Sequence, residues 1–266
     1  MDFRFIDGTI TTPQGFTGAA ICGGIKEGNT TKKDIMMVKC DTLCNAAAVY
    51  TKNLVKSDAI LVTQEHLKNG KAQAIVANSG NANTCNADGY KKASDVCKLC
   101  ASTLNIAEDD VIVASTGVIG VPLPLEPFEQ KLYLMKKMMS SENGSDCAEA
   151  IMTTDTVKKE MAMEMTIDGK TVGGIAKGSG MIHINMGTML SFVTTDCAIS
   201  SKMLEEALKE AVEDSYNMVS VDGDNSTNDT LAIMASGKAG NKEITTKNED
   251  YKTFVAGLTE AFKSLA

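Results

Sequence analysis

The chain has 266 residues, which is enough for one large domain with a sizeable buried core or for two small ones. Its hydrophobic content of 43% and charged content of 23% are ordinary for a globular protein, and its net charge of -8 argues against a nucleic-acid partner, which favours a basic surface. The first residues lack a signal-peptide pattern and no apolar run reaches membrane-spanning length, so we expect a cytoplasmic protein with no membrane segment.

Short apolar runs bounded by Gly, Asn, Asp or Thr predict buried strands. Such runs lie at residues 35–38, 59–62, 74–77, 111–114, 190–194 and 231–235. Residues 161–167 and 171–176 are predicted to form a hairpin, because the Asp168-Gly169 pair between them is typical of a tight β-turn.

Apolar residues at helical spacing predict four helices. They cover residues 91–104, residues 126–139 with Pro127 in the first turn, a segment that starts near Ser200, and a last segment that runs from the N-cap residue Asn248 towards Ala266. Strands and helices interleave without strict alternation, which predicts sheets covered by helices and not a purely parallel doubly wound fold. The last helix keeps its apolar face to the end of the sequence, which fits either a docked terminal helix or a chain that continues.

Eight cysteines are present, but their spacing does not favour a metal site or disulfides. Cys97 and Cys100 fall on the apolar face of the helix predicted at 91–104, where a free cysteine behaves as a small hydrophobic residue. No second cysteine pair follows at zinc spacing, and neither His66 nor His183 completes a ligand set. We therefore predict no metal and free thiols, as in a reducing cytoplasm.

The sequence offers few side chains for common catalytic arrangements. The glycine-rich stretch at 173–180 lacks the Lys-Ser or Lys-Thr of a phosphate loop, and the stretch from Asp222 lacks the glycine and glutamate of a calcium loop. With two histidines, a Ser-His-Asp triad has few candidates. An N-terminal Thr, Ser or Cys needs no histidine, because its own α-amino group can accept the proton.

The Gly187-Thr188 step is a candidate for such a nucleophile. Cleavage of this bond would free the amino group of Thr188, whose ordinary pKa of about 7.7 to 8.0 suits a base at neutral pH. The small Gly187 lets a hydroxyl approach its carbonyl closely, and the strand predicted at 190–194 would hold Thr188 in place. The alternative is that Thr188 simply opens a strand, which is the commoner role of such a threonine.

Five longer motifs follow one another along the chain. They are ANSGNAN at 77–83, ASTGVIG at 114–120, MTTDT at 152–156, GGIAKGSGMIHINMGTMLSFVTTD at 173–196 and VDGDNSTNDT at 221–230. In content and order these motifs resemble the bifunctional ornithine acetyltransferase / N-acetylglutamate synthase family of arginine biosynthesis. Five ordered matches spread over the chain make the resemblance highly specific.

The resemblance implies an α/β (α+β) fold, an αββα sandwich of the self-processing ornithine acetyltransferase / aminopeptidase type. It implies self-cleavage between Gly187 and Thr188, which would give an N-terminal chain of residues 1–187 and a C-terminal chain beginning with residues 188–266. The two chains would stay together as an αβ heterodimer within a larger oligomer. Acetyl would pass from N-acetylornithine through Thr188 to glutamate, with acetyl-CoA as a further donor in bifunctional members and no bound cofactor.

The resemblance also implies roles for single residues. Thr188 would be the nucleophile and, once freed, would supply the amine base. Thr116 and Gly117 would bind the developing oxyanion through a hydroxyl and a backbone N–H. Taken without the resemblance, residues 115–117 are simply a turn at the end of a strand.

Other matched residues would bind substrate or support the site. Lys177 is implied to meet the charged end of the substrate, although a lysine alone is more often solvated. Thr153 would line the same pocket, with Thr154 as the neighbouring alternative. Asn81 and the loop at 222–230 are expected to support the site and not to react.

Two departures from the family pattern qualify these expectations. The usual motif reads Pro-Asn-Met-Ala-Thr, whereas residues 184–188 read Ile-Asn-Met-Gly-Thr, so a looser backbone should slow cleavage. Family members also continue past the last helix with a Glu-Gly-Ala-Thr-Lys segment that is absent here, from which we expect a truncated or split member. Two alternatives therefore stay open: a self-processing aminopeptidase or amidohydrolase that uses water as acceptor, and an inactive fragment that needs a C-terminal partner.

Overall fold

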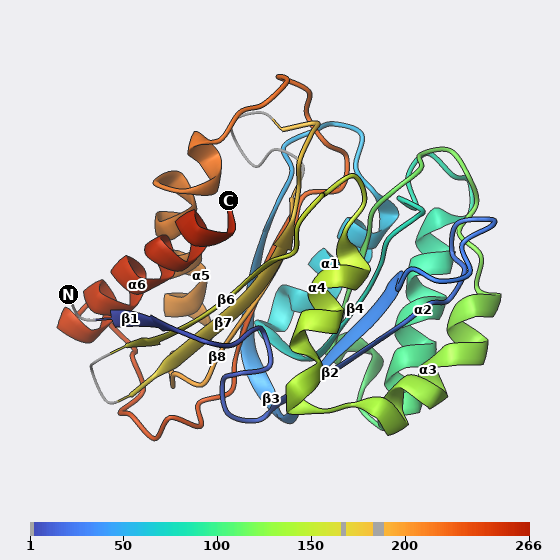
Figure 1. Cartoon of the computed structure of the whole chain (residues 1–266). Helices are drawn as coiled ribbons and strands as arrows, with labels where there is room; N and C mark the ends of the chain where they lie inside the picture. The colour runs from blue at the N-terminus through green and yellow to red at the C-terminus, as the bar shows by residue number, and fades with distance from the viewer. Residues whose placement is uncertain (1–2, 166–168, 183–188) are drawn as a thin grey trace.

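The computed structural model describes residues 3–165, 169–182 and 189–266 (Figure 1). Its strands are β1 (Phe3–Ile6), β2 (Phe16–Ile21), β3 (Ile35–Tyr50), β4 (Lys71–Asn78), β5 (Val111–Ser115), β6 (Lys159–Met165), β7 (Thr171–Lys177), β8 (Leu190–Thr195) and β9 (Thr230–Ala235). Its α-helices are α1 (Asp58–His66), α2 (Gly89–Leu104), α3 (Glu126–Met138), α4 (Gly144–Ile151), α5 (Ser201–Glu213) and α6 (Glu249–Leu265). Within these ranges, no helix combines the length and apolar character needed to cross a membrane.

The described strands form one mixed sheet in the order β1-β6-β7-β8-β9-β3-β4-β5, with β2 also paired to β3. The long strand β3 joins the two halves of this sheet. Its residues 35–40 pair antiparallel with β2, and the same stretch borders β4 on its other edge. Its residues 45–50 pair antiparallel with β9. The ladder to β4 shifts register between Lys39 and Cys44, and such an irregularity bends a strand, so the sheet can fold over on itself.

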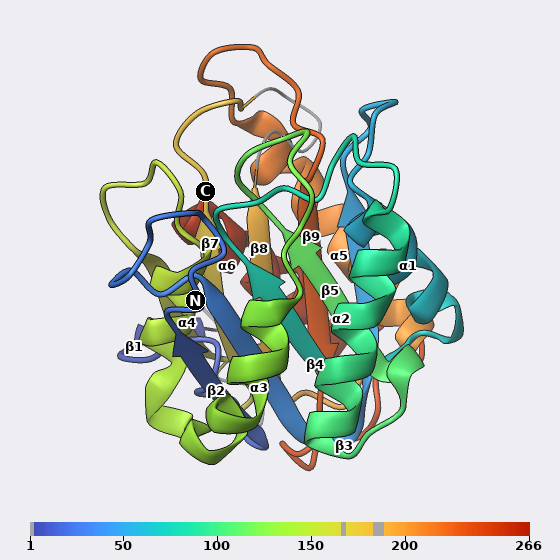
Figure 2. The ribbon, with the colours of Figure 1, turned by 90° about the vertical axis from the view of Figure 1, so that its right-hand side faces the viewer.

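Buried apolar side chains form three layers. The two halves of the sheet lie between these layers, and helices cover the outer faces of the sheet (Figures 1 and 2). Neighbouring residues of a strand point to opposite faces, so Val76 packs with Phe128 under α1, α2 and α3, whereas Ile75 points to the central layer. The central layer also holds Phe192 of β8, from the other half of the sheet. Helices α5 and α6 cover the outer face of that other half. The αββα sandwich is therefore confirmed, with its two sheets continuous through β3.

The strand predicted at 59–62 is wrong, because these residues lie in α1. The side chain of Ser57 accepts a hydrogen bond from the N–H of Ala59 and so caps the helix. Ala59, Val62 and His66 recur at helical spacing and are buried. A four-residue apolar run is too short to show whether its period is that of a strand or of a helix.

The other predicted elements are confirmed. The five remaining strand predictions lie in β3, β4, β5, β8 and β9, the helices correspond to α2, α3, α5 and α6, and the hairpin is the β6–β7 pair. The hairpin's Asp168 lies outside the described residues. The sequence did not indicate β1, β2 or α4. Strand β2 contains Gly18, where an added Cβ would lie 2.9 Å from Cys147 Sγ of α4, so this glycine permits a close helix–sheet approach and carries no strand signal of its own.

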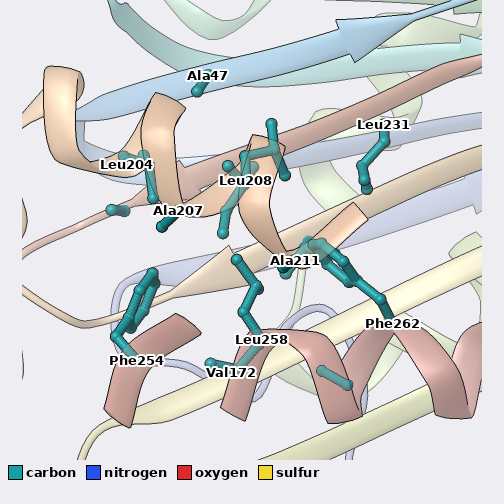
Figure 3. Packing of buried hydrophobic residues seen from close by; sticks show 14 of the residues in the cluster. Ala47, Val172, Leu204, Ala207, Leu208, Ala211, Leu231, Phe254, Leu258 and Phe262 are labelled. Atoms are coloured by element: carbon teal, nitrogen blue, oxygen red, sulfur yellow. The ribbon is translucent and has the colours of Figure 1, made fainter. Parts of the chain in front are cut away.

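Helix α6 packs on α5 and on the outer face of the sheet (Figure 3). Its predicted N-cap is confirmed, because the side chain of Asn248 accepts a hydrogen bond from the N–H of Tyr251 at 2.9 Å. Phe254, Leu258 and Phe262 are all buried in the layer between the helix and the sheet. The apolar face predicted from the sequence is thus docked against the rest of the molecule.

Replacing Phe262 with Ala should lower the free energy of unfolding by about 3–5 kcal/mol. The side chain is fully buried, and its ring stacks on Tyr216 with centroids 5.3 Å apart. Urea unfolding measures the loss. The neighbouring exposed residue offers a control, since Lys263→Ala should change stability by less than about 0.5 kcal/mol. Equal losses in the two variants would contradict tight packing of α6.

Candidate active site

Loops at one end of the sandwich line a cavity of about 840 Å³. Most of these loops lie in the upper part of Figure 2. The lining comes from segments that are far apart in the sequence: residues 26–34, 79–80, 116–119, 152–154, 177–181 and 226–228. A cavity of this size, built from loops on a rigid scaffold, suits a small molecule.

Thr116 and Gly117 follow β5 directly and line the cavity. Thr116 is buried, and its backbone N–H donates to the carbonyl oxygen of Asn78 at 3.0 Å, which fastens the turn to the end of β4. Gly117 has a φ of +134°, and an added Cβ would lie 2.4 Å from the carbonyl carbon of Gly80. A residue with a side chain would therefore push the turn away from the loop that follows β4.

Asn228 connects three of the loops around the cavity. Its Nδ2 donates to the carbonyl oxygens of Ala82 and Ser115, at 2.6 and 2.8 Å. Its Oδ1 accepts hydrogen bonds from the hydroxyls of Thr84 and Thr227, at 2.9 and 2.6 Å. This buried and fully bonded amide fixes the turn after β5 against the loop before β9.

Lys177 is the last residue of β7, and only 3% of it is exposed. It lines the cavity and pairs with Leu190, the first residue of β8. Burial lowers the pKa of its amino group to about 8, although Asp155 and Asp229 favour the charged form. The plainer expectation of a solvated lysine is therefore wrong.

Thr153 and Thr154 both line the cavity in the loop after α4. Thr153 is half-buried, and its N–H donates to Asp155 Oδ2 at 3.0 Å. Thr154 is exposed, and its hydroxyl lies 2.8 Å from that of Ser179. Because Asp155 Oδ1 also accepts the N–H of Gly178 at 2.6 Å, the loop is tied to the end of β7. Both threonines thus remain candidates for contact with substrate.

Asp229 is a buried acid beside the start of β8. Its Oδ1 accepts the N–H of Met189 at 2.9 Å, and the N–H of Thr230 donates to the carbonyl oxygen of Met189 at 3.0 Å. Burial raises the pKa of the Asp229 carboxyl to about 7, although the Ser226 hydroxyl, the N–H of Met189 and the charge of Lys177 favour the ionised form. Its second oxygen, Oδ2, makes no hydrogen bond of good geometry with the residues that the structure describes, and the nearby Ser226 hydroxyl is the side chain that interacts with this carboxylate.

The segment between β2 and β3 forms a further wall of the cavity. The buried carboxylate of Asp34 accepts the N–H groups of Gly23 and Ile25, at 2.6 and 2.8 Å, and so shapes this segment. Lys32 Nζ donates to the carbonyl oxygen of Met152 at 2.7 Å, which links it to the loop after α4. This wall carries no local signal in the sequence, because its lysines and glycines follow no period and no recognised motif.

The cavity brings together the predicted site residues that the structure describes. These are Thr116, Gly117, Thr153 and Lys177. The predicted cleavage residues, Gly187 and Thr188, lie outside the described residues. Asn228 and Asp229 were expected only to support the site; the motif at 221–230 was the signal that pointed to them. All eight cysteines are free thiols, and the described part of the chain holds no cluster of three or more metal-binding side chains.

Lys177→Met should change stability in a manner that depends on pH. Between pH 8 and about 10.4, Lys177 is protonated in the unfolded chain but mostly neutral in the folded chain. The free energy of unfolding of the wild type therefore rises with pH in this window. Below this window the wild type carries the full cost of a buried ammonium group, which methionine lacks. We expect the variant to be the more stable protein near pH 7, with a difference that shrinks towards pH 10. Urea unfolding across this range tests the prediction, and a difference independent of pH would contradict it.

Comparison with solved structures first defines the class of fold. The L-aminopeptidase D-Ala-esterase/amidase of Ochrobactrum anthropi, described as a new variant of the Ntn hydrolase fold, superposes with a TM-score of 0.56. The match covers 98% of this chain and 87% of that one at 11% sequence identity, so it concerns the fold alone. This chain therefore has the sandwich of that Ntn hydrolase variant.

Closer relatives then define the family. Ornithine acetyltransferase of Mycobacterium tuberculosis, solved in complex with ornithine, is 31% identical with a TM-score of 0.64, covering 71% of this chain and 100% of that one. The arginine biosynthesis bifunctional protein ArgJ of Symbiobacterium thermophilum is 45% identical over 266 residues, 99% of this chain and 66% of its own length. The model of the ArgJ family matches residues 17–266. The chain belongs to the ArgJ family and spans just under two thirds of the length of that relative.

Proposed function

We propose that this chain is a glutamate N-acetyltransferase that cuts itself between Gly187 and Thr188 and then moves acetyl from N-acetylornithine to glutamate through Thr188. The observation that supports this most is the link between the cavity wall and the start of β8. Leu190 pairs on one side with Lys177, which lines the cavity, and on the other side with Thr230, which follows the lining residues 226–228. The first described residues of β8 are therefore held between two strands that lead to the cavity wall.

The proposed cleavage needs no group from outside the chain except water. Thr188 Oγ1 attacks the carbonyl carbon of Gly187, the peptide C–N bond breaks, and the hydroxyl proton passes to the departing nitrogen. Water then hydrolyses the ester, which leaves a carboxylate on Gly187 and a free amino group on Thr188. The products are residues 1–187 and 188–266, held together as a heterodimer.

The length of a solved relative supports this division. The chain of the Mycobacterium tuberculosis ornithine acetyltransferase is matched over its whole length and covers 71% of this chain, and 71% of 266 residues is about 189. A chain of that size is close in length to the 187 residues that precede Thr188 in this sequence.

In the proposed transfer, the amine of Thr188 accepts the proton of its own hydroxyl, which attacks the acetyl carbonyl. The hydroxyl of Thr116 and the N–H of Gly117 stabilise the resulting oxyanion, and ornithine leaves. Glutamate then takes the acetyl group by the same steps in reverse order. Lys177, the buried cation of the cavity, would bind the carboxylate that both amino-acid substrates carry. Thr153 would contact the same substrates.

Further parts of the proposal concern partners and place in the cell. Acetyl-CoA would serve as a second donor, without any resident cofactor. Assembly beyond the heterodimer and a cytoplasmic location remain predictions, the latter resting on eight unpaired thiols, which suit a reducing compartment.

An assay of the purified chain with N-acetylornithine, with and without glutamate, tests the proposal. We expect acetylglutamate to form, and ornithine release to exceed one equivalent only when glutamate is present. Release of acetate without acetylglutamate would favour the hydrolase alternative, in which water is the acceptor. A single uncut species with no product would favour the fragment that depends on a C-terminal partner, and activity restored by that partner would establish it.

A further inference from the structure

Lys32 is a second cation of the cavity, and the proposed reaction does not yet use it. It lies in the wall between β2 and β3, where it is half-buried and lines the cavity. Its Nζ donates to the carbonyl oxygen of Met152 at 2.7 Å, and it forms no ion pair with the residues that the structure describes. An ammonium group has three N–H donors, so two donors and the positive charge remain available to an anionic ligand.

Lys177 supplies the first cation, near the other end of the same loop. The loop after α4 begins at Met152, which is bonded to Lys32, and it reaches Asp155, whose negative charge acts on the ammonium of Lys177. The three residue steps from 152 to 155 span at most about 10–11 Å. The two lysines therefore meet the ends of a short segment, and Thr153 lines the cavity between them.

A dicarboxylate with five carbons fits such a pair of cations. Its carboxyl carbons lie about 5 Å apart in the extended form, and a charge-assisted N–H···O bond at each end adds about 2.8 Å. Cations at the two ends of a segment of this length can therefore each bind one carboxylate. L-Glutamate belongs to this class, whereas L-glutamine has the same shape and lacks the side-chain carboxylate.

We propose that Lys32 selects the acceptor, because its ammonium binds the side-chain carboxylate of glutamate while Lys177 binds the α-carboxylate. This inference rests on the proposed function, in which glutamate is the acceptor. Both cations are in place in the uncut chain, so binding can be measured whether or not the chain is cleaved.

The same wall offers an acid to the donor. N-Acetylornithine carries an ammonium at the end of its side chain, which a cation at Lys32 disfavours. The carboxylate of Asp34 already accepts three hydrogen bonds from its own segment. Glu27 is exposed and lines the cavity, so it is the carboxylate of this wall that can receive the ornithine ammonium. Lys32 therefore favours the acceptor and not the donor.

Calorimetric titration of the purified chain with L-glutamate, L-glutamine and L-ornithine tests the inference. At pH 7, below the Lys177 pKa of about 8, the wild type should bind glutamate about tenfold or more tightly than glutamine. In Lys32→Met this preference should disappear, while the affinity for ornithine should not fall. Because glutamate and glutamine differ in charge and not in shape, a loop merely displaced by the substitution would weaken all three ligands alike.

Three further variants make the test specific. Lys32→Arg keeps the cation and should keep the preference for glutamate. Lys33→Met is the matched control, because this neighbouring lysine pairs with Asp146 and Glu149 and does not line the cavity; its three affinities should equal those of the wild type. Lys26→Met removes the exposed lysine of the same wall and should also keep the preference.

The outcomes separate this inference from the proposed function. Equal losses for all three ligands in Lys32→Met would give Lys32 a structural role, and a preference lost only in Lys26→Met would assign the selection to Lys26; either result overturns the inference. A wild type that does not prefer glutamate overturns it as well, even if acetylglutamate forms in the transfer assay. A wild type that prefers glutamate but transfers no acetyl refutes the proposed function and leaves the role of Lys32 in binding intact.

Discussion

Replacing Thr188 with Ala should leave the chain in one piece and reduce acyl transfer by about 10⁴-fold or more. The proposed reaction draws both its nucleophile and its base from this residue, and alanine has no hydroxyl with which to cut the preceding bond. Intact mass spectrometry should show one species for the variant and two, residues 1–187 and 188–266, for the wild type. Acetylglutamate formation from N-acetylornithine measures the loss of transfer.

Two further variants test whether the loss of cleavage and acyl transfer is caused by the missing hydroxyl of Thr188. Thr188→Ser keeps a hydroxyl and should still be cleaved, at a reduced rate. Thr259→Ala removes a hydroxyl from α6 that donates to the carbonyl oxygen of Val255, away from the cavity, and should leave cleavage unchanged. The proposed function fails should the Thr188→Ala chain stay intact and yet transfer acetyl at the wild-type rate.

Thr116→Val should lower kcat by about 10²- to 10³-fold, while KM changes little. Valine has nearly the shape of threonine, and the anchoring bond from the N–H of residue 116 to Asn78 is made by the backbone, so the turn should keep its place. The lost hydroxyl serves an oxyanion that forms only in the transition state, and such a loss appears in kcat and kcat/KM together. Steady-state rates of the cleaved protein provide the measurement.

A rescue variant makes this second prediction specific. Thr116→Ser keeps a hydroxyl at this position and should retain most of the wild-type kcat. Thr259→Val makes the same change of threonine to valine on α6 and should leave kcat unchanged. A Thr116→Val protein with wild-type kcat and a raised KM would show that the residue binds ground-state substrate and not the oxyanion.

Much of the architecture could be predicted from local pattern. The N-cap at Asn248, the start of α5 near Ser200 and the apolar spacing of α5 and α6 are properties of neighbouring residues, so the sequence alone indicated them. The same reasoning failed at residues 59–62, where only the capping by Ser57 and the packing of α1 separate a helix from a strand. The segment between β2 and β3 carried no local signal, because its conformation depends on the buried carboxylate of Asp34.

By itself the sequence determined the succession of most helices and strands, the membership of a family through five ordered motifs, and the set of candidate site residues. Only the tertiary structure decided that Lys177 is buried, that Asn228 connects three loops, and that the buried Asp229 accepts the N–H of Met189. The reason is physical. Spacing along the chain governs which face of a helix or strand is apolar, whereas burial, pKa and the meeting of loops arise from contacts between residues tens to hundreds of positions apart, which form only when β3 folds the sheet over on itself.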